Sequence, residues 1–270
     1  MSDDIIKILF FGDLVGRPGR FAVRDYLSEH KYDFVIANVE NASHGFGLTE
    51  KNYKHLLDYG IDCMTSGNHI WDKKDIYTFI DDADRLIRPY NYPIGTKGVG
   101  SRMFDCGNYK IAVINILGKV FINAIDFQWQ LVTDEIKRLK EITPIVIVDF
   151  HAEATAEKVC FARYCSELGV SAFFGTHTHV QTADECIINT MGYITDAGFC
   201  GATNGVIGME YSTSLARFLT GIPERYEVAS GKTSQVNAVT VNVDIKTGCA
   251  KSIERIFCIL DNDKEGENES

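Results

Sequence analysis

The chain has 270 residues, a formal net charge of −10 and an isoelectric point near 5.2. This length suits one large layered domain with a substantial core, and the acidic balance excludes the broad basic surface that proteins bound to extended nucleic acid usually present. A small phosphate substrate stays compatible with it, because a bound metal can neutralise phosphate locally.

The first segment, MSDDIIKILFFGD, is acidic and then becomes apolar. Its apolar run is too short for a membrane span and has no basic start typical of a signal peptide, so we expect a first strand at residues 5–11. Eight cysteines are scattered along the chain without a C-x-x-C pair, which predicts reduced thiols. These features together predict a cytoplasmic protein with no membrane segment.

The next segments alternate between buried strands and amphipathic helices, which is typical of a parallel sheet. Helix boundaries are marked by Pro18 near one start, by Thr49 as an N-cap and by Gly60 as a stop. The expected elements are a helix from Pro18 to about His30, a strand at 33–39, a helix from Thr49 to Gly60 and a strand at 61–65.

Antiparallel pairs appear after residue 101. A hairpin is expected around Gly107-Asn108, and two more at 186–195 and 236–259. Between them we expect a helix at 125–141, a strand at 145–150, a helix at 155–168 and a strand at 170–174. The pattern predicts an α/β fold with mixed sheets between helical layers, as one domain over residues 1–260, followed by an acidic tail, DNDKEGENES (261–270), expected to be disordered.

Side chains that bind metals follow five of the predicted strands, at the point where each strand ends. Because the carboxyl ends of parallel strands form the crevice where α/β proteins bind ligands, we expect these residues to converge. They are Asp13, Glu40, Asn41, Asn68, His69, His151, His177 and His179.

The chemistry of this set suits a metal cluster. Carboxylate, amide oxygen and neutral imidazole together favour Mn, Fe or Zn, and no thiolate is included. Glu40 is the expected bridging carboxylate, because its neighbour Asn41 can add a second oxygen. Two ions about 3.5–4 Å apart would bind phosphate oxygens and convert a bridging water into hydroxide.

Five sequence blocks resemble a known family. GDLVG (12–16), NVENAS (38–43), SGNHIWD (66–72), DFHAE (149–153) and GTHTHVQT (175–182) are similar to the calcineurin-like metallophosphoesterase superfamily, and more closely to its YmdB-type branch of bacterial cyclic-nucleotide phosphodiesterases. The resemblance extends to about Leu260 and implies the layered α/β/β/α sandwich of that superfamily. One departure is that Asp13 is followed by Leu14 and Val15, where the wider superfamily has Asp-x-His. Asn41 after Glu40 points to the YmdB-type branch instead.

The resemblance also implies roles for the residues. It assigns Asp13, Glu40, Asn41 and His179 to one ion, and Glu40, Asn68, His151 and His177 to the other. His69 is left as the catalytic group that stabilises the transition state or protonates the leaving oxygen. The implied reaction is hydrolysis of 2′,3′- or 3′,5′-cyclic nucleotides by in-line attack of a metal-bridging hydroxide.

Several positions keep two interpretations. An isolated strand-end Asp13 or Asn68 often only caps a turn, and the turn after Gly175 can aim His177 and His179 to one side or apart. His44, in the loop after Asn41, is a candidate substrate contact. Arg17 could reach phosphate, although a surface role is favoured. The segment 201–210, GATNGVIGME, is either a wall of the substrate pocket or only a loop.

Two other functions remain open. A phosphomonoesterase or nucleotidase would use the same ions, and a weakly catalytic, nucleotide-sensing regulator of RNA decay would keep the metal site without much turnover. The ligands do not fix the metal among Fe, Mn and Zn. The expected partner is a small phosphodiester, without an extended nucleic-acid surface, and a homo-oligomer is compatible with the chain.

Overall fold

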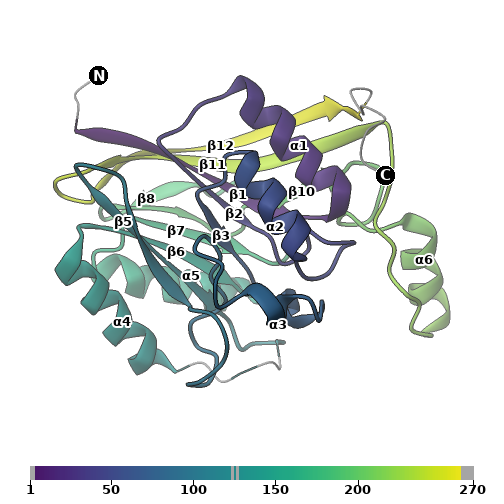
Figure 1. Ribbon diagram of the computed structural model, residues 1–270, viewed down its shortest axis with the longest axis horizontal. Coiled ribbons are helices and arrows are strands. Elements are labelled where there is room, and N and C mark those ends of the chain that lie inside the picture. The colour runs from purple at the N-terminus through teal and green to yellow at the C-terminus, as the bar shows by residue number, and fades with distance from the viewer. Residues whose placement is uncertain (1–3, 123–124, 126–127, 263–270) are drawn as a thin grey trace.

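The computed structural model describes residues 4–122, 125 and 128–262, and it contains two six-stranded sheets that face each other, with helices on both outer sides (Figure 1). The first sheet contains, in spatial order, β12 (Ala250–Asp261), β11 (Thr233–Asp244), β10 (Phe199–Ala202), β1 (Ile5–Leu14), β2 (Phe34–Asn38) and β3 (Cys63–Thr65). The second contains β4 (Ser101–Asp105), β5 (Lys110–Leu117), β6 (Ile145–His151), β7 (Ala172–Thr176), β9 (Met191–Ile194) and β8 (Cys186–Ile188).

Helices cover the outer face of each sheet. The described helices are α1 (Gly16–Glu29), α2 (Glu50–Asp58), α3 (Ile76–Phe79), α4 (Trp129–Ile142), α5 (Thr155–Glu167) and α6 (Tyr211–Thr220), with a short 3₁₀ helix at Asn68–Trp71. Helices α1 and α2 pack on the first sheet, and α4 and α5 pack on the second. Figure 1 shows α6 standing away from both sheets.

Alternation of side chains along the strands builds three apolar layers. On β1, Ile8 and Phe10 face the second sheet, where the ring of Phe10 stacks on that of Phe174 at 4.5 Å. Their neighbours Leu9 and Phe11 face α1 and α2. Strand β6 divides its side chains in the same way, with Val146 and Val148 facing α4 and α5. Each strand face is therefore buried, as period-two geometry requires, and the predicted α/β/β/α sandwich is confirmed.

Strand directions explain how the site is assembled. Strand β2 runs parallel to β1 and β3, and β6 runs parallel to β5 and β7. The three predicted hairpins are antiparallel pairs in the structure, β4 with β5, β8 with β9, and β11 with β12. Both sheets are mixed, and the parallel strands of each end on the side where the candidate ligands lie.

Some predicted boundaries are wrong. The helix expected from Ile125 begins at Trp129, and residues 126–127 lie outside the described part of the chain. The tail was expected from Asp261, but Asp261 belongs to β12 and the Asn262 backbone N–H donates to the Lys232 carbonyl at 2.7 Å. The rest of the predicted tail, 263–270, is outside the described residues. Helix α6 was not expected, because it buries only Ser214 and shows no stripe facing the core.

Two further expectations concern the whole described chain. Within it, no helix combines the length and apolar character needed to cross a bilayer. All eight cysteines lie in this part and are free thiols.

Candidate metal centre

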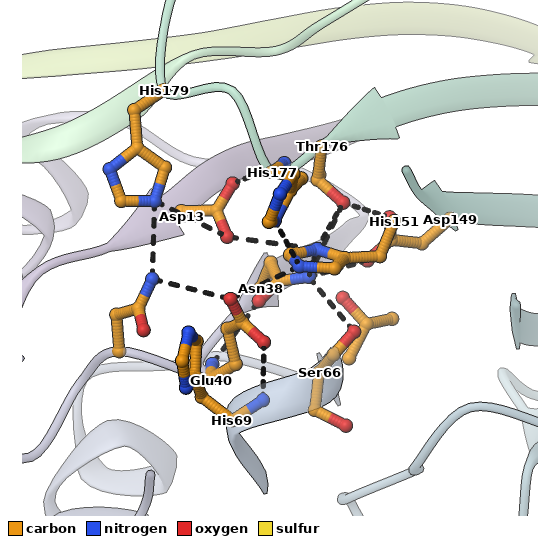
Figure 2. Close-up of polar contacts among 12 residues, drawn as sticks. Asp13, Asn38, Glu40, Ser66, His69, Asp149, His151, Thr176, His177 and His179 are labelled. Atoms are coloured by element: carbon orange, nitrogen blue, oxygen red, sulfur yellow. Dashed lines mark hydrogen bonds and ion pairs between the residues drawn. The ribbon is translucent and has the colours of Figure 1, made fainter. Parts of the chain in front are cut away.

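Five strand ends bring the predicted ligands together (Figure 2). Strand β1 supplies Asp13, the turns after β2 and β3 supply Glu40 and Asn68, β6 ends in His151, and the loop after β7 supplies His177. Convergence is confirmed, but these ends belong to two facing sheets rather than to one edge. The centre lies where the two halves of the sandwich meet.

One half of the centre is built around Glu40. Glu40, His151 and His177 each offer one side-chain atom that could bind a metal, and these three atoms lie within 4.8 Å of one another. The Nε2 of His151 is 3.1 Å from Oε1 of Glu40 and 3.0 Å from Nδ1 of His177. Two imidazoles and one carboxylate therefore face a common point.

The other half is built around Asp13. The Nε2 of His179 lies 3.9 Å from Oδ1 of Asp13 and 3.1 Å from the side-chain nitrogen of Asn41. His177 and His179 both have positive φ, 104° and 63°. This turn aims the two imidazoles apart, one towards each half of the centre, as Figure 2 shows.

Unpaired oxygens are the clearest sign that a cation fits here. Oδ1 of Asp13, Oδ1 of Asn41 and Oδ1 of Asn68 are buried and have no hydrogen-bond partner among the described residues. An unsatisfied buried acceptor costs about 1–3 kcal/mol, so three near one another would be expensive without a further partner. Carboxylate and amide oxygens beside neutral imidazoles match the donor set of a divalent transition metal. The residues present therefore fit metal ions.

Gly67 shows how tightly the centre is built. A Cβ at this position would overlap Oε2 of Glu40 and the ring of His151. Only glycine lets the chain pass so close to these two candidate ligands and present Asn68 and His69 on the next turn. This explains the glycine in the GNH block.

A buried polar network that the sequence did not reveal orients His151. Its Nδ1 is 2.9 Å from Oγ1 of Thr176, and that hydroxyl donates to Oδ1 of Asp149 at 2.7 Å. Asn38 donates to Oδ2 of Asp149 at 3.0 Å. With Nδ1 engaged, Nε2 is the nitrogen that faces Glu40. Burial raises the pKa of Asp149 to about 7. Asn38 and Asp149 lie inside the blocks NVENAS and DFHAE, and being polar at a strand end is the only signal that could have found them.

A buried ion pair holds the loop that carries His177 and His179. The Lys158 ammonium lies 2.6 Å from Oδ2 of Asp196, and both side chains are 1% exposed. The same Asp196 oxygen accepts hydrogen bonds from the backbone N–H and the hydroxyl of Thr178, at 3.1 and 2.7 Å. Thr178 stands between the two histidines, so this pair fixes the left-handed turn that separates them.

His69 stands at the rim of the centre. Its Nδ1 is 2.8 Å from Oδ2 of Asp72, and its backbone N–H donates to Oε2 of Glu40 at 3.0 Å. The ring meets the edge of Phe46 at a centroid distance of 4.9 Å. Because Nδ1 contacts Asp72, Nε2 is the ring nitrogen left to contact a bound substrate.

A cavity of about 360 Å³ opens beside these residues. One wall contains Glu40, Asn41, His69, His177 and His179. Apolar side chains also line the cavity, from Phe46, Val206, Ile207, Met209, Phe218 and Tyr226. Three of these come from segment 201–210, which is therefore a pocket wall rather than only a loop. The exposed His44 lines a neighbouring cavity and is not part of this one.

The imidazoles differ in their affinity for protons. Burial lowers the pKa of His151, but the Glu40 carboxylate more than reverses this and raises it to about 9. Burial, and then the charge of His151, lower the pKa of His177 to about 3. At neutral pH the metal-free protein therefore holds a proton on His151 and none on His177.

Metal binding is expected to release about one proton near neutral pH. The ion needs the nitrogen lone pair of His151 that the proton occupies in the metal-free protein. The apparent affinity should rise as the pH approaches about 9, where this proton leaves by itself. Calorimetric titration of the metal-free protein with Mn²⁺ in buffers of different ionisation enthalpy measures the number released. The same binding heat in every buffer would contradict the assignment.

The chain is similar to known proteins in both sequence and structure. The model of the YmdB-like protein family matches residues 9–256. A 2′,3′-cyclic-nucleotide 2′-phosphodiesterase of Bacillus subtilis is 44% identical over 257 residues, which cover 93% of this chain and 97% of that protein. A crystal structure of a phosphatase from Mycoplasma pneumoniae is 35% identical with a TM-score of 0.87, over 95% of this chain and 94% of that one. A crystal structure of a hypothetical protein from Thermus thermophilus has the same identity and TM-score, over 94% and 99%.

Proposed function

The chain belongs to the YmdB-like protein family, and from this membership and the centre described above we propose that it is a metal-dependent phosphodiesterase that hydrolyses cyclic nucleotides. The observation that supports this most is the set of three unpaired buried oxygens, on Asp13, Asn41 and Asn68, around the Glu40 carboxylate. The set offers donors for more than one ion at the mouth of a cavity of small-molecule size.

We assign the ligands to two ions that share Glu40. Asp13, Asn41 and His179 complete one set, and Asn68, His151 and His177 complete the other. The grouping of Glu40 with His151 and His177, and the approach of His179 to Asn41, support this assignment. When bound, Fe, Mn or Zn ions would polarise the phosphoryl oxygens and lower the pKa of the attacking water.

His69 is the proposed catalytic residue. Its place on the cavity wall, and the anchoring of Nδ1 by Asp72, direct Nε2 towards a phosphate held at the centre. From there it donates a proton to the ribose oxygen that leaves phosphorus, or a hydrogen bond to the charged transition state. Asp72 keeps the ring oriented.

The apolar wall favours a nucleotide over a simpler phosphodiester. Aromatic side chains stack on nucleobases of any sequence, and Phe46 and Tyr226, which both line the cavity, lie 6.3 Å apart between ring centroids. We propose 2′,3′-cyclic nucleotides as the first substrate class, as for the Bacillus subtilis relative, with 3′,5′-cyclic nucleotides as the second.

The test is hydrolysis of 2′,3′-cAMP, 3′,5′-cAMP, bis-p-nitrophenyl phosphate and 5′-AMP by protein reconstituted with Mn, Fe or Zn. We expect cleavage of a cyclic diester, and a loss of at least about 100-fold in Asn68→Ala, since even outer-shell changes at metal sites cost 10–100-fold. The matched control is Asn108→Ala, in the exposed turn after β4. Faster release of phosphate from 5′-AMP would make the protein a nucleotidase, and no cleavage with any of these metals would favour the regulator.

A further inference from the structure

A second cavity adjoins the metal centre. Its volume is about 750 Å³, roughly twice that of the metal cavity, and Tyr226 lines both. Arg17 and His44 come to it from the segments after β1 and β2, and Arg225 and Lys232 from the segment between α6 and β11. The two residues that the sequence suggested as phosphate or substrate contacts, Arg17 and His44, thus lie together here and not beside the metal ligands.

Charge distinguishes this cavity from the rest of the surface. The chain carries a net charge of −10, yet the cavity wall has three cationic side chains, on Arg17, Arg225 and Lys232, against the single carboxylate of Glu227. None of the three forms an ion pair with a carboxylate within residues 4–122, 125 and 128–262. The Arg17 guanidinium lies 4.8 Å from the centre of the Phe21 ring. Such a wall attracts an anion with more than one charge.

A small apolar cluster lies where the two cavities adjoin. Phe46, Tyr226 and Val228 pack with Met209 in one small cluster. Met209 lines the metal cavity and Val228 lines the second one. A ligand longer than one nucleotide would therefore pass from one cavity to the other along Tyr226.

A single cyclic nucleotide gives the basic cavity nothing to bind. It has one phosphate, and under the proposed function the metal ligands engage that phosphate. A cyclic 2′,3′-phosphate is also the form in which the 3′ end of an RNA strand can terminate, because the ring needs the ribose 2′-oxygen. In that case the strand continues from the 5′ side and brings further phosphodiesters, which arginine and lysine recognise.

We propose that the basic cavity binds the phosphodiester upstream of a terminal 2′,3′-cyclic phosphate, so that short oligoribonucleotides with such ends are substrates. This inference rests on the proposed function. It concerns one or two nucleotides beyond the terminal one and requires no extended nucleic-acid surface. Binding of the product strand, measured without catalysis, tests this inference separately from the proposed hydrolysis.

The first arm compares kcat/KM for 2′,3′-cAMP with that for the dinucleotide ApA ending in a 2′,3′-cyclic phosphate. We expect an advantage on the order of 10-fold for the dinucleotide, the size of one charge-assisted hydrogen bond, seen mainly in KM. The double variant Arg17→Ala/Arg225→Ala should remove the advantage and leave 2′,3′-cAMP unchanged. The variant Lys137→Ala/Arg163→Ala removes the same charge from exposed positions on α4 and α5 and should keep it.

The second arm measures binding without catalysis. ApA ending in a 3′-phosphate should bind the protein on the order of 10-fold more tightly than 3′-AMP, with a steeper dependence on salt, and Arg17→Ala/Arg225→Ala should abolish the difference. Equal binding of the two ligands, or equal losses in both double variants, would overturn the inference and leave the proposed function intact. Preserved discrimination in binding without hydrolysis of any substrate would instead overturn the proposed function alone.

Discussion

Replacing His69 with alanine is expected to lower kcat by roughly 10²–10⁴-fold, the range of general acid catalysis, while leaving the metal content unchanged. The side chain binds Asp72 and not the metal ligands, and its contact with Glu40 is made by the backbone N–H, which alanine keeps. The loss should therefore appear in the rate and not in metal retention. Metal analysis and steady-state kinetics on the same samples separate the two effects.

Controls make the result specific to this imidazole. His55→Ala removes a histidine from α2, away from the cavity, and should have no effect. Asp72→Asn should lower kcat less than His69→Ala does, because the ring remains but loses the charged partner that orients it. Loss of metal from His69→Ala would make His69 a ligand, and unchanged turnover would remove it from the mechanism.

Replacing Lys158 with methionine is expected to lower the free energy of unfolding by about 3–5 kcal/mol, the cost of leaving a buried charge without its partner. Asp196 would keep its hydrogen bonds from Thr178 but lose the ammonium 2.6 Å away. The loop with His177 and His179 would then be held by a carboxylate that has lost its charge partner, so metal affinity should fall as well. Denaturant unfolding and metal retention after dialysis measure the two losses.

A double replacement tests whether the lost charge pair causes this instability. Lys158→Met/Asp196→Asn removes both charges and keeps an acceptor for Thr178, so it should recover most of the lost stability. Lys246→Met breaks an exposed pair with Asp4 and should change stability little. If the double variant were as unstable as Lys158→Met, the packing of the lysine stem rather than its charge would be responsible.

The convergence of the candidate ligands could be predicted because each of them follows a recognisable buried strand. Asp13 after an apolar run, Glu40 after another and His151 after IVIVDF are all consequences of strand direction, and direction follows from the alternation of strands with helices. The same logic gave the layered architecture. It did not give the pairing of the strand ends between two sheets, because pairing depends on contacts far apart in sequence.

Other parts of the site leave no local signal. A lysine in the first turn of a helix normally predicts a solvated position, yet Lys158 is buried beside Asp196. The aim of His177 and His179 depends on two positive φ angles that no sequence rule assigns to histidine. Tyr226 comes from a segment without regular structure, and its place between two cavities follows only from the packing of Phe46 and Val228 around it.

The position of the centre at the meeting of the two sheets has a mechanical consequence. The candidate ligands from β1, β2 and β3 lie at the first sheet and those from β6 and β7 at the second, so under the proposed function an ion held between them would join the two sheets. Metal binding at this end of the sandwich would then add to the stability that the apolar layer between the sheets provides, where Phe10 stacks on Phe174. Loosening that distant layer should weaken the hold on metal, although none of its residues approaches the ion.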